Sequence, residues 1–429
     1  MDMTTAIAMA VVMLGPTVSR RGRRKKSVFT GLSGIRVKPA RVIASLVVVG
    51  LAIWVGLASF ASVVRKTDPD RAGTLVPYDA NSLALRSRGA LTAGSLREAR
   101  ALATAALKRD ATAVDAVQTM GISAQASGNM PEAGRWLNYA EHLSRRALPT
   151  HLWGIEYHVA RNDTAQVLKH YDLALRTSAQ ARDTLYPLLG AALEDPEIVK
   201  GLLERLAKRP LWSADFLSYL ASDGSVSPVS AAKFLTVAKR IGLNAPPSSL
   251  GVLILRSWQT RQPVAAWQAY LLEHPGADRR KVRNPNFGEV PSDATLFDWV
   301  LTDTGSIFAQ IVGVSDNRNR LNVVASAGAA GLVAQQVQFL PSAEYIVRIG
   351  VDETALFDGS LYWSMQCDTG MDLGKVAVQS SEAHSLLEMD VKVPHQGCMT
   401  QLLQLNAYSG DSPEGMRALF SSVSIEQVK

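Results

Sequence analysis

The sequence lacks the motifs by which the common enzyme classes are recognised. It contains no Walker phosphate loop, no GxGxxG after a strand, no GxSxG, no HExxH and no CxxC, so the reactions that these motifs support have no residues to carry them. Histidine is scarce, and His151 and His158, with Glu156 between them, are seven residues apart rather than the four of a zinc-binding helix. This spacing indicates packed or solvated side chains. We therefore predict no catalytic residues, no metal ligands and no cofactor.

Acidic residues are almost absent from the first 41 residues, which hold nine Lys and Arg but a single acid, Asp2. The whole chain has 45 Lys and Arg against 38 Asp and Glu, a net charge of +7. Setting residues 1–41 aside leaves 36 basic and 37 acidic residues, a net charge of −1. Because the basic excess is local and the remainder is balanced, nucleic acid is not expected as a partner.

Charge is absent altogether from residues 42–64, an apolar run of 23 residues. A helix of that length spans about 35 Å, enough to cross a hydrocarbon core of about 30 Å. Since the basic residues precede the run, the positive-inside rule predicts a cytoplasmic N-terminus and a body across the membrane. A signal peptide is the alternative, but the run is long for its apolar region and no A-x-A site follows it. We predict a single uncleaved transmembrane helix.

Cysteine is limited to two residues, Cys367 and Cys398. Both follow the apolar run, on the side of the membrane that the charge asymmetry makes the oxidising one, where paired thiols form disulfides. We predict a Cys367–Cys398 bridge that closes a loop of about 31 residues.

Small residues recur with a spacing of 34 in the segment 81–208. The turn residues Gly94, Gly128 and Asn162 are followed by three columns in register: Ala99, Ala133 and Val167; Ala103, Leu137 and Tyr171; Ala106, Ala140 and Ala174. Gly or Asn suits the left-handed turn that ends a first helix, and a small residue lets the second helix pack closely. The pattern resembles the tetratricopeptide repeat (TPR) and predicts an α-solenoid, whose concave face usually binds a protein segment.

After residue 208 the regular period is lost, although the helical pattern continues through residues 209–274 as an irregular stack. A degenerate fourth unit is expected at the boundary, with Asp195 and Pro196 at the turn and Gly201 in the small-residue column. From residue 284 apolar and polar residues alternate with period two, and polar turns separate about nine short segments. This pattern predicts an antiparallel β-sandwich, with a jelly roll as its arrangement.

Aromatic residues make up only 7% of the chain, and those of the sandwich are the candidates for a sugar-binding platform. They are Phe297, Trp299, Phe308, Tyr345, Tyr362, Trp363 and Tyr408. Trp363 shares a strand face with Leu361 and Met365, which predicts a core position, whereas Tyr362 lies on the other face. We take Trp299 and Tyr362 as the possible ligand contacts.

Several short segments of the body recur in one family. They are 210–212 (PLW), 216–217 (FL), 284–289 (NPNFGE), 297–299 (FDW), 361–363 (LYW) with Cys367, 393–394 (VP) with Cys398, and 401–402 (QL). With the repeat columns, they resemble the membrane-anchored TPR proteins of Gram-negative bacteria, especially alphaproteobacteria, whose C-terminal jelly roll is similar to carbohydrate-binding modules. The resemblance covers about residues 85–429. One departure is that relatives read Asn-Gly-x-Phe-Glu where this chain reads NPNFGE.

The resemblance implies a non-enzymatic accessory protein of cell-surface or exopolysaccharide production, of α+β multidomain class, anchored in the inner (cytoplasmic) membrane with a periplasmic body. The expected segments are a basic cytoplasmic segment (1–41), a transmembrane helix (42–64), a linker (65–80), TPR-like repeats (81–208), irregular helical repeats (209–274) and the jelly roll (284–429). The leading hypothesis is a scaffold for protein partners of a polysaccharide assembly or export machine. The alternative is a carbohydrate-binding protein that retains nascent polysaccharide, and a polysaccharide lyase or hydrolase is a third.

Overall fold

The fold is that of a computed structural model, which describes residues 39–64, 67–76, 79–290, 293–314, 318–379 and 383–428. The chain divides into two units, Met1–Tyr78 and Asp79–Lys429. Residues 1–38, which make up nearly all of the expected basic segment, lie outside the described residues.

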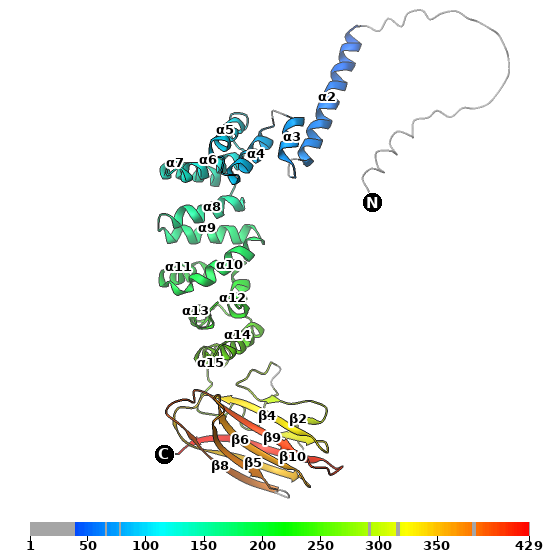
Figure 1. The fold of residues 1–429 in the computed structure, drawn as a ribbon, viewed down its shortest axis with the longest axis vertical. Coiled ribbons are helices and arrows are strands. Elements are labelled where there is room, and N and C mark those ends of the chain that lie inside the picture. The colour runs from blue at the N-terminus through cyan, green and yellow to red at the C-terminus, as the bar shows by residue number, and fades with distance from the viewer. Residues whose placement is uncertain are drawn as a thin grey trace, which may run out of the picture. The chain divides into compact units, whose positions relative to one another are not determined.

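The first unit contains the apolar helix α2, Pro39–Val64 (Figure 1). Its stretch Leu46–Val64 has a mean hydropathy of 2.3 and is 6% buried. Large apolar side chains such as Leu46, Trp54 and Phe60 are exposed. By length and composition this helix can cross a membrane, as residues 42–64 predicted.

A short helix, α3 (Pro69–Leu75), occupies part of the segment that was expected to be a linker. The side chain of Asp68 caps it by accepting a hydrogen bond from the Arg71 amide at 2.9 Å. Pro69 stands at the start of the helix, where a residue without an N–H loses no bond. Pro69 therefore opens a helix within the expected linker.

The second unit begins with three helix pairs. They are α4 (Ala80–Thr92) with α5 (Leu96–Leu107), α6 (Val114–Ala126) with α7 (Met130–Leu143), and α8 (Leu148–Val159) with α9 (Thr164–Thr177). The turn residues Gly94, Gly128 and Asn162 have φ values of +78°, +77° and +54°. This is the left-handed conformation that the 34-residue pattern predicted.

The small-residue columns form the contact between paired helices. Ala99 and Ala133 are fully buried, as are Ala106, Ala140 and Ala174 of the last column. A larger side chain there would push the helices apart, which explains why this part of the chain is rich in alanine. The predicted TPR-like solenoid is confirmed.

Gly121 on α6 provides a test of this packing. A Cβ atom at Gly121 would lie 2.0 Å from the ring of Trp153 on α8. We expect Gly121→Ala to lower the free energy of unfolding by about 1–3 kcal/mol, because the ring must move within a packed core. Gly89→Ala is the matched control, since a Cβ on that exposed helical residue meets nothing within 4 Å and should stabilise by about 0.5–1 kcal/mol. Thermal unfolding of both variants checks the pair, and equal effects would contradict the packing.

Six further helices complete the solenoid. They are α10 (Ala181–Ala191), α11 (Pro196–Leu206), α12 (Ser213–Ser222), α13 (Pro228–Arg240), α14 (Pro247–Gln259) and α15 (Pro263–Leu271). Where the degenerate fourth unit was expected, Asp195 caps α11 and accepts a hydrogen bond from the Glu197 amide at 2.8 Å. One continuous apolar core runs from α8 to α15.

Two five-stranded antiparallel sheets form the C-terminal sandwich (Figure 1). Its strands are β1 (Val300–Leu301), β2 (Ile307–Gly313), β3 (Asn319–Ala325), β4 (Ala330–Gln338), β5 (Ala343–Ala355), β6 (Ser360–Cys367), β7 (Asp372–Val378), β8 (Ala383–Val393), β9 (Gln401–Tyr408) and β10 (Met416–Gln427). The orders are β1-β4-β9-β6-β7 and β2-β3-β10-β5-β8. The predicted antiparallel jelly-roll sandwich is confirmed.

The core of the sandwich follows the period-two alternation. Leu361, Trp363 and Met365 on β6 are fully buried, as predicted. Trp363 makes edge-on contacts with Trp299 and Phe420, at centroid distances of 5.9 and 5.5 Å. Because these strands bury one side chain in two, their other side chains form the outer faces on which a site can lie.

Candidate functional site

The outer surface of the β1-β4-β9-β6-β7 sheet carries a row of three uncharged polar side chains that ends at a lysine. Gln335 on β4, Gln404 on β9 and Ser364 on β6 are cross-strand neighbours, and Lys375 on β7 ends the row. A row across four strands spans about 14 Å. This arrangement gives a strip of hydrogen-bonding groups, in which Ser364 is 2% exposed.

Two further rows add an amide and two aromatic rings. Asn406 on β9 pairs with Tyr362 on β6, and Tyr408 pairs with Ser360. We call this surface the polar face and define it by the following side chains: Gln335, Ser364, Gln404, Asn406, Tyr362, Tyr408 and Lys375. Rings beside amides are the combination by which proteins hold sugars, because a ring covers the apolar side of a sugar and amides bond its hydroxyls.

The amides of the polar face retain unused hydrogen-bonding groups. The Nε2 of Gln404 donates to the Oε1 of Gln335 at 3.3 Å, and the Nδ2 of Asn406 donates to the Oγ of Ser364 at 3.4 Å. An amide carries two donors and two acceptor lone pairs. The Nε2 of Gln335, the Oε1 of Gln404 and the Oδ1 of Asn406 therefore keep capacity for the hydroxyls of a ligand.

The two tyrosines differ in their accessibility. Tyr408 is 60% exposed, so its ring is open to a ligand. Tyr362 is half-buried, and the Nζ of Lys375 lies 3.6 Å from the centroid of its ring. A ligand that stacks on Tyr362 must move the flexible Lys375 side chain aside, which makes Tyr408 the more accessible ring.

The outer surface of the second sheet has a different chemistry. Arg348 pairs with Glu388 and Glu426, and Lys392 pairs with Glu344 at 2.8 Å. Their mutual hydrogen bond lowers the pKa of the Glu344 carboxyl below its usual value and raises the pKa of the Lys392 ammonium above its own. Exposed ion pairs of this kind are typical of a solvated protein surface. The two faces of the sandwich are therefore not equivalent.

Trp299, one of the two ligand contacts expected from the sequence, lies in the core. It is 2% exposed, and its ring packs on Trp363 and on Phe287. Its Nε1 donates a hydrogen bond to the carbonyl of Asn284 at 3.2 Å. No ring face is open to a ligand, so this expectation is corrected. Tyr362 lies on the outer face, as its place in the alternation predicted.

The segment 297–299 joins the solenoid to the sandwich. Phe297 packs edge-on against Trp267 of α15 at 5.1 Å, whereas Trp299 enters the core of the sandwich. Between them, Asp298 accepts a hydrogen bond from the hydroxyl of Tyr270 at 2.8 Å. Burial, and secondarily Asp298, raises the pKa of Tyr270 well above its usual value, which keeps the hydroxyl a donor. Phe297, Asp298 and Trp299 therefore have structural roles at this junction.

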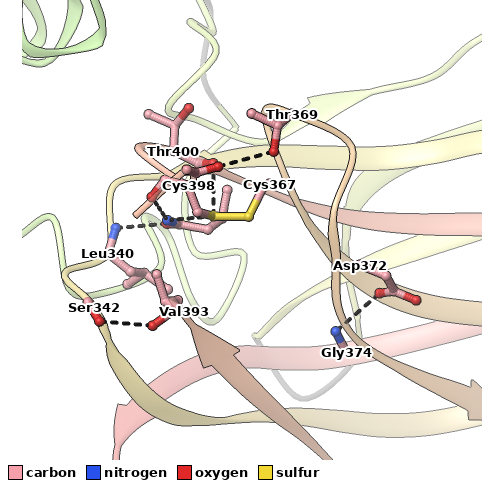
Figure 2. Close-up of a disulfide and its surroundings, with 11 residues drawn as sticks. Leu340, Ser342, Cys367, Thr369, Asp372, Gly374, Val393, Cys398 and Thr400 are labelled. Carbon is pink, nitrogen blue, oxygen red and sulfur yellow. Dashed lines mark hydrogen bonds between the residues drawn. A yellow bond between two sulfur atoms is a disulfide. The ribbon is translucent and has the colours of Figure 1, made fainter. Parts of the chain in front are cut away.

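The disulfide Cys367–Cys398 is present, as predicted. Figure 2 shows that it ties the end of β6 to the loop before β9. Gln401 supports the same corner, since its Oε1 accepts a hydrogen bond from the amide of Leu340 at 2.9 Å and its Nε2 donates to the carbonyl of Cys398 at 3.4 Å. The bridge therefore closes the sandwich at the end of the strands that carry the polar face.

The solenoid contains a groove of about 890 Å³ between α11 and α13. Val199 and Leu203 of α11 line one side, and Phe234, Val237 and Ile241 line the other. Charged side chains of both signs also line it, including Lys200, Glu204 and Lys233. An apolar groove with a charged border is suited to an amphipathic protein segment.

No family model matches this chain, and no curated protein matches it. Among solved structures, the arabinose-bound MgGH51 α-L-arabinofuranosidase aligns with 34% of this chain and 26% of its own, at 15% identity and a TM-score of 0.28. The chain thus spans about a quarter of that enzyme. TmCBM61, solved with β-1,4-galactotriose, aligns with 34% of this chain and 97% of its own, at 12% identity and a TM-score of 0.25.

A third solved structure is PilF of Pseudomonas aeruginosa. It aligns with 46% of this chain and 77% of its own, at 18% identity and a TM-score of 0.24. All three TM-scores are below 0.5, so these partial similarities assign no function to this chain.

Proposed function

We propose that this protein binds a neutral polysaccharide through the polar face of its sandwich and holds it near a membrane without cleaving it. The observation that carries the proposal is the set of cross-strand rows in which Gln335, Gln404 and Asn406 lie beside Tyr362 and Tyr408. Uncharged donors and acceptors suit the hydroxyls of a neutral sugar, and the open ring of Tyr408 suits its apolar side.

The absence of cleavage is part of the proposal. Glycoside hydrolysis uses two carboxylates on opposite sides of the scissile bond. On the outer surface of the β1-β4-β9-β6-β7 strands, the described residues include one carboxylate, Asp372, at the edge strand β7. A face of this kind supports binding rather than hydrolysis.

Calorimetry tests this function: the full-length protein in detergent is titrated with the polysaccharide of the cells that produce it. A saturable heat that short oligosaccharides of the same polymer compete away supports the proposal. No heat, or release of shortened product during the titration, counts against it. The Lys375→Gln variant distinguishes a neutral polymer from an acidic one. Removing the positive charge should weaken the binding of an acidic polymer only.

A scaffold role is the second candidate, and the groove between α11 and α13 favours it. Its proposed occupant is an amphipathic segment of a protein in the polysaccharide assembly or export machine. A photo-reactive residue in place of Val237, in the groove, should crosslink that machine in cells. The same substitution at Leu188, which is exposed but does not line the groove, should not. Equal crosslinking at both positions would contradict the proposal.

We further propose that α2 anchors the protein in the inner membrane with its body in the periplasm. The basic residues before α2 and the disulfide in the sandwich support this orientation. A reporter fused after Lys429 that is active only outside the cytoplasm is the expected result. Activity only inside the cytoplasm would overturn the orientation.

A further inference from the structure

Three helices of the solenoid bring nitrogen and carboxylate groups together in its interior. His151 on α8 and His170 on α9 are each 1% exposed, and their Nδ1 atoms are 3.5 Å apart. Glu141 on α7 reaches the same place, with its Oε1 atom 3.2 Å from the Nε2 of His170. One ligand atom from each residue lies within 4.8 Å of the other two.

The hydrogen bonds of this cluster leave it one proton short. The Nε2 of His151 is 3.0 Å from the carbonyl of Arg145, which can only accept, so the Nδ1 of His151 carries a lone pair. A neutral His170 can place its proton toward that lone pair or toward Glu141, but not toward both. In either arrangement, one of these two contacts joins two acceptor atoms with no proton between them.

The other atoms of the cluster do not supply the missing proton. Lys169 is 3.7 Å from the Oε2 of Glu141, while the Oε1 of Glu141 is buried without a hydrogen-bond partner. The Nδ1 of His158, whose ring stacks on His170 at 5.3 Å, is also buried without one.

The surrounding backbone is shaped to hold the imidazole of His170. A Cβ atom on Gly154, one turn after His151 on α8, would lie 2.4 Å from that ring. The side chain of Glu141 keeps 21% exposure, so this residue lies between the buried imidazoles and the solvent. The cluster thus has tightly packed ligands.

We propose that Glu141, His151 and His170 form a binding site for a divalent transition-metal ion of the Zn²⁺ class. Two nitrogen ligands about 2.0–2.1 Å from a tetrahedral zinc lie about 3.3 Å apart, close to the separation of the two Nδ1 atoms. Neutral imidazoles with a carboxylate suit such ions. The Glu141 carboxylate can bind the ion or orient His170 from its Nε2 side, as metal-bound histidines require. An ion here would join α7, α8 and α9.

Metal titration of the full-length protein tests this site. The protein is purified without a histidine tag, stripped with a chelator and titrated with Zn²⁺ against a chromophoric competitor. We expect one tight equivalent, and with Co²⁺ the visible absorption of a four-coordinate ion. His151→Asn and His170→Asn should remove the tight equivalent, and Glu141→Gln should weaken it about 10- to 100-fold. His142 is an exposed histidine on the same helix as Glu141. The His142→Gln variant should therefore bind Zn²⁺ as the wild type does.

Circular dichroism keeps the test independent of folding. The partly exposed Glu141→Gln should keep the helical signal of the wild type even if the buried histidine variants do not. The proposal is overturned if the stripped protein takes up no tight equivalent. It is also overturned if folded Glu141→Gln binds as tightly as the wild type, or if His142→Gln loses as much affinity as Glu141→Gln.

Discussion

Replacing both Cys367 and Cys398 by Ala is expected to lower the free energy of unfolding of the sandwich by about 3.5 kcal/mol. The bridge joins residues 31 apart in sequence, and the loss follows from the freedom that the unfolded chain regains. For a domain of about 145 residues this corresponds to a fall in melting temperature of about 10 °C. A loss of about 3.5 kcal/mol is a large fraction of the free energy of unfolding of a typical domain.

The measurement must separate the sandwich from the solenoid. Hydrogen exchange of peptides from β6 and β9, followed through a denaturant series, reports on the strands that the bridge closes. Peptides from α4 and α5 serve as the internal control and should be unaffected. Reduction of the wild type should reproduce the loss, so an unchanged midpoint on reduction would contradict the prediction. Mass spectrometry of the wild type under non-reducing conditions should find no alkylatable thiol.

Truncation of the two tyrosines is expected to have the largest effect on glycan binding. Tyr408→Ala should weaken the affinity about tenfold, and the double variant with Tyr362→Ala about a hundredfold, because each ring supplies apolar contact area to the proposed surface. Tyr408→Phe keeps the ring and should keep most of the affinity. Calorimetry with one polysaccharide preparation compares the variants.

Leu386→Ala is the matched control for these substitutions. Leu386 is 60% exposed, as Tyr408 is, but lies on β8 in the opposite sheet. Its truncation should leave affinity unchanged. If it weakened binding as much as Tyr408→Ala, the glycan would not be bound by the polar face.

The elements of this fold follow from local patterns in the sequence. The columns through Gly94, Gly128 and Ala99 predicted the helix pairs, because turn chemistry and close helix packing are decided within one 34-residue unit. Alternation placed Trp363 inside and Tyr362 outside for the same reason. The disulfide was predictable because the chain has only two cysteines and both were expected on the oxidising side of the membrane.

The candidate sites were harder to predict because they depend on register and on contacts between distant elements. Gln335 and Gln404 become neighbours only through the pairing of β4 with β9, which no local pattern specifies. Trp299 precedes a two-residue strand, so no alternation showed which way it points. Sequence spacing relates His151 to His158 on its own helix, whereas the structure places it beside His170 of the next helix. The recurring Gln and Asn of β9 at positions 404 and 406 were the available signal for the polar face.

The most direct test of glycan binding by the polar face is hydroxyl-radical footprinting of the full-length protein with and without its polysaccharide. This method measures how readily individual side chains react from solvent. We predict that oxidation of Tyr408 falls strongly when the polysaccharide is bound, while that of the equally exposed Leu386 does not change. Protection of Leu386 with Tyr408 left reactive would contradict glycan binding by the polar face.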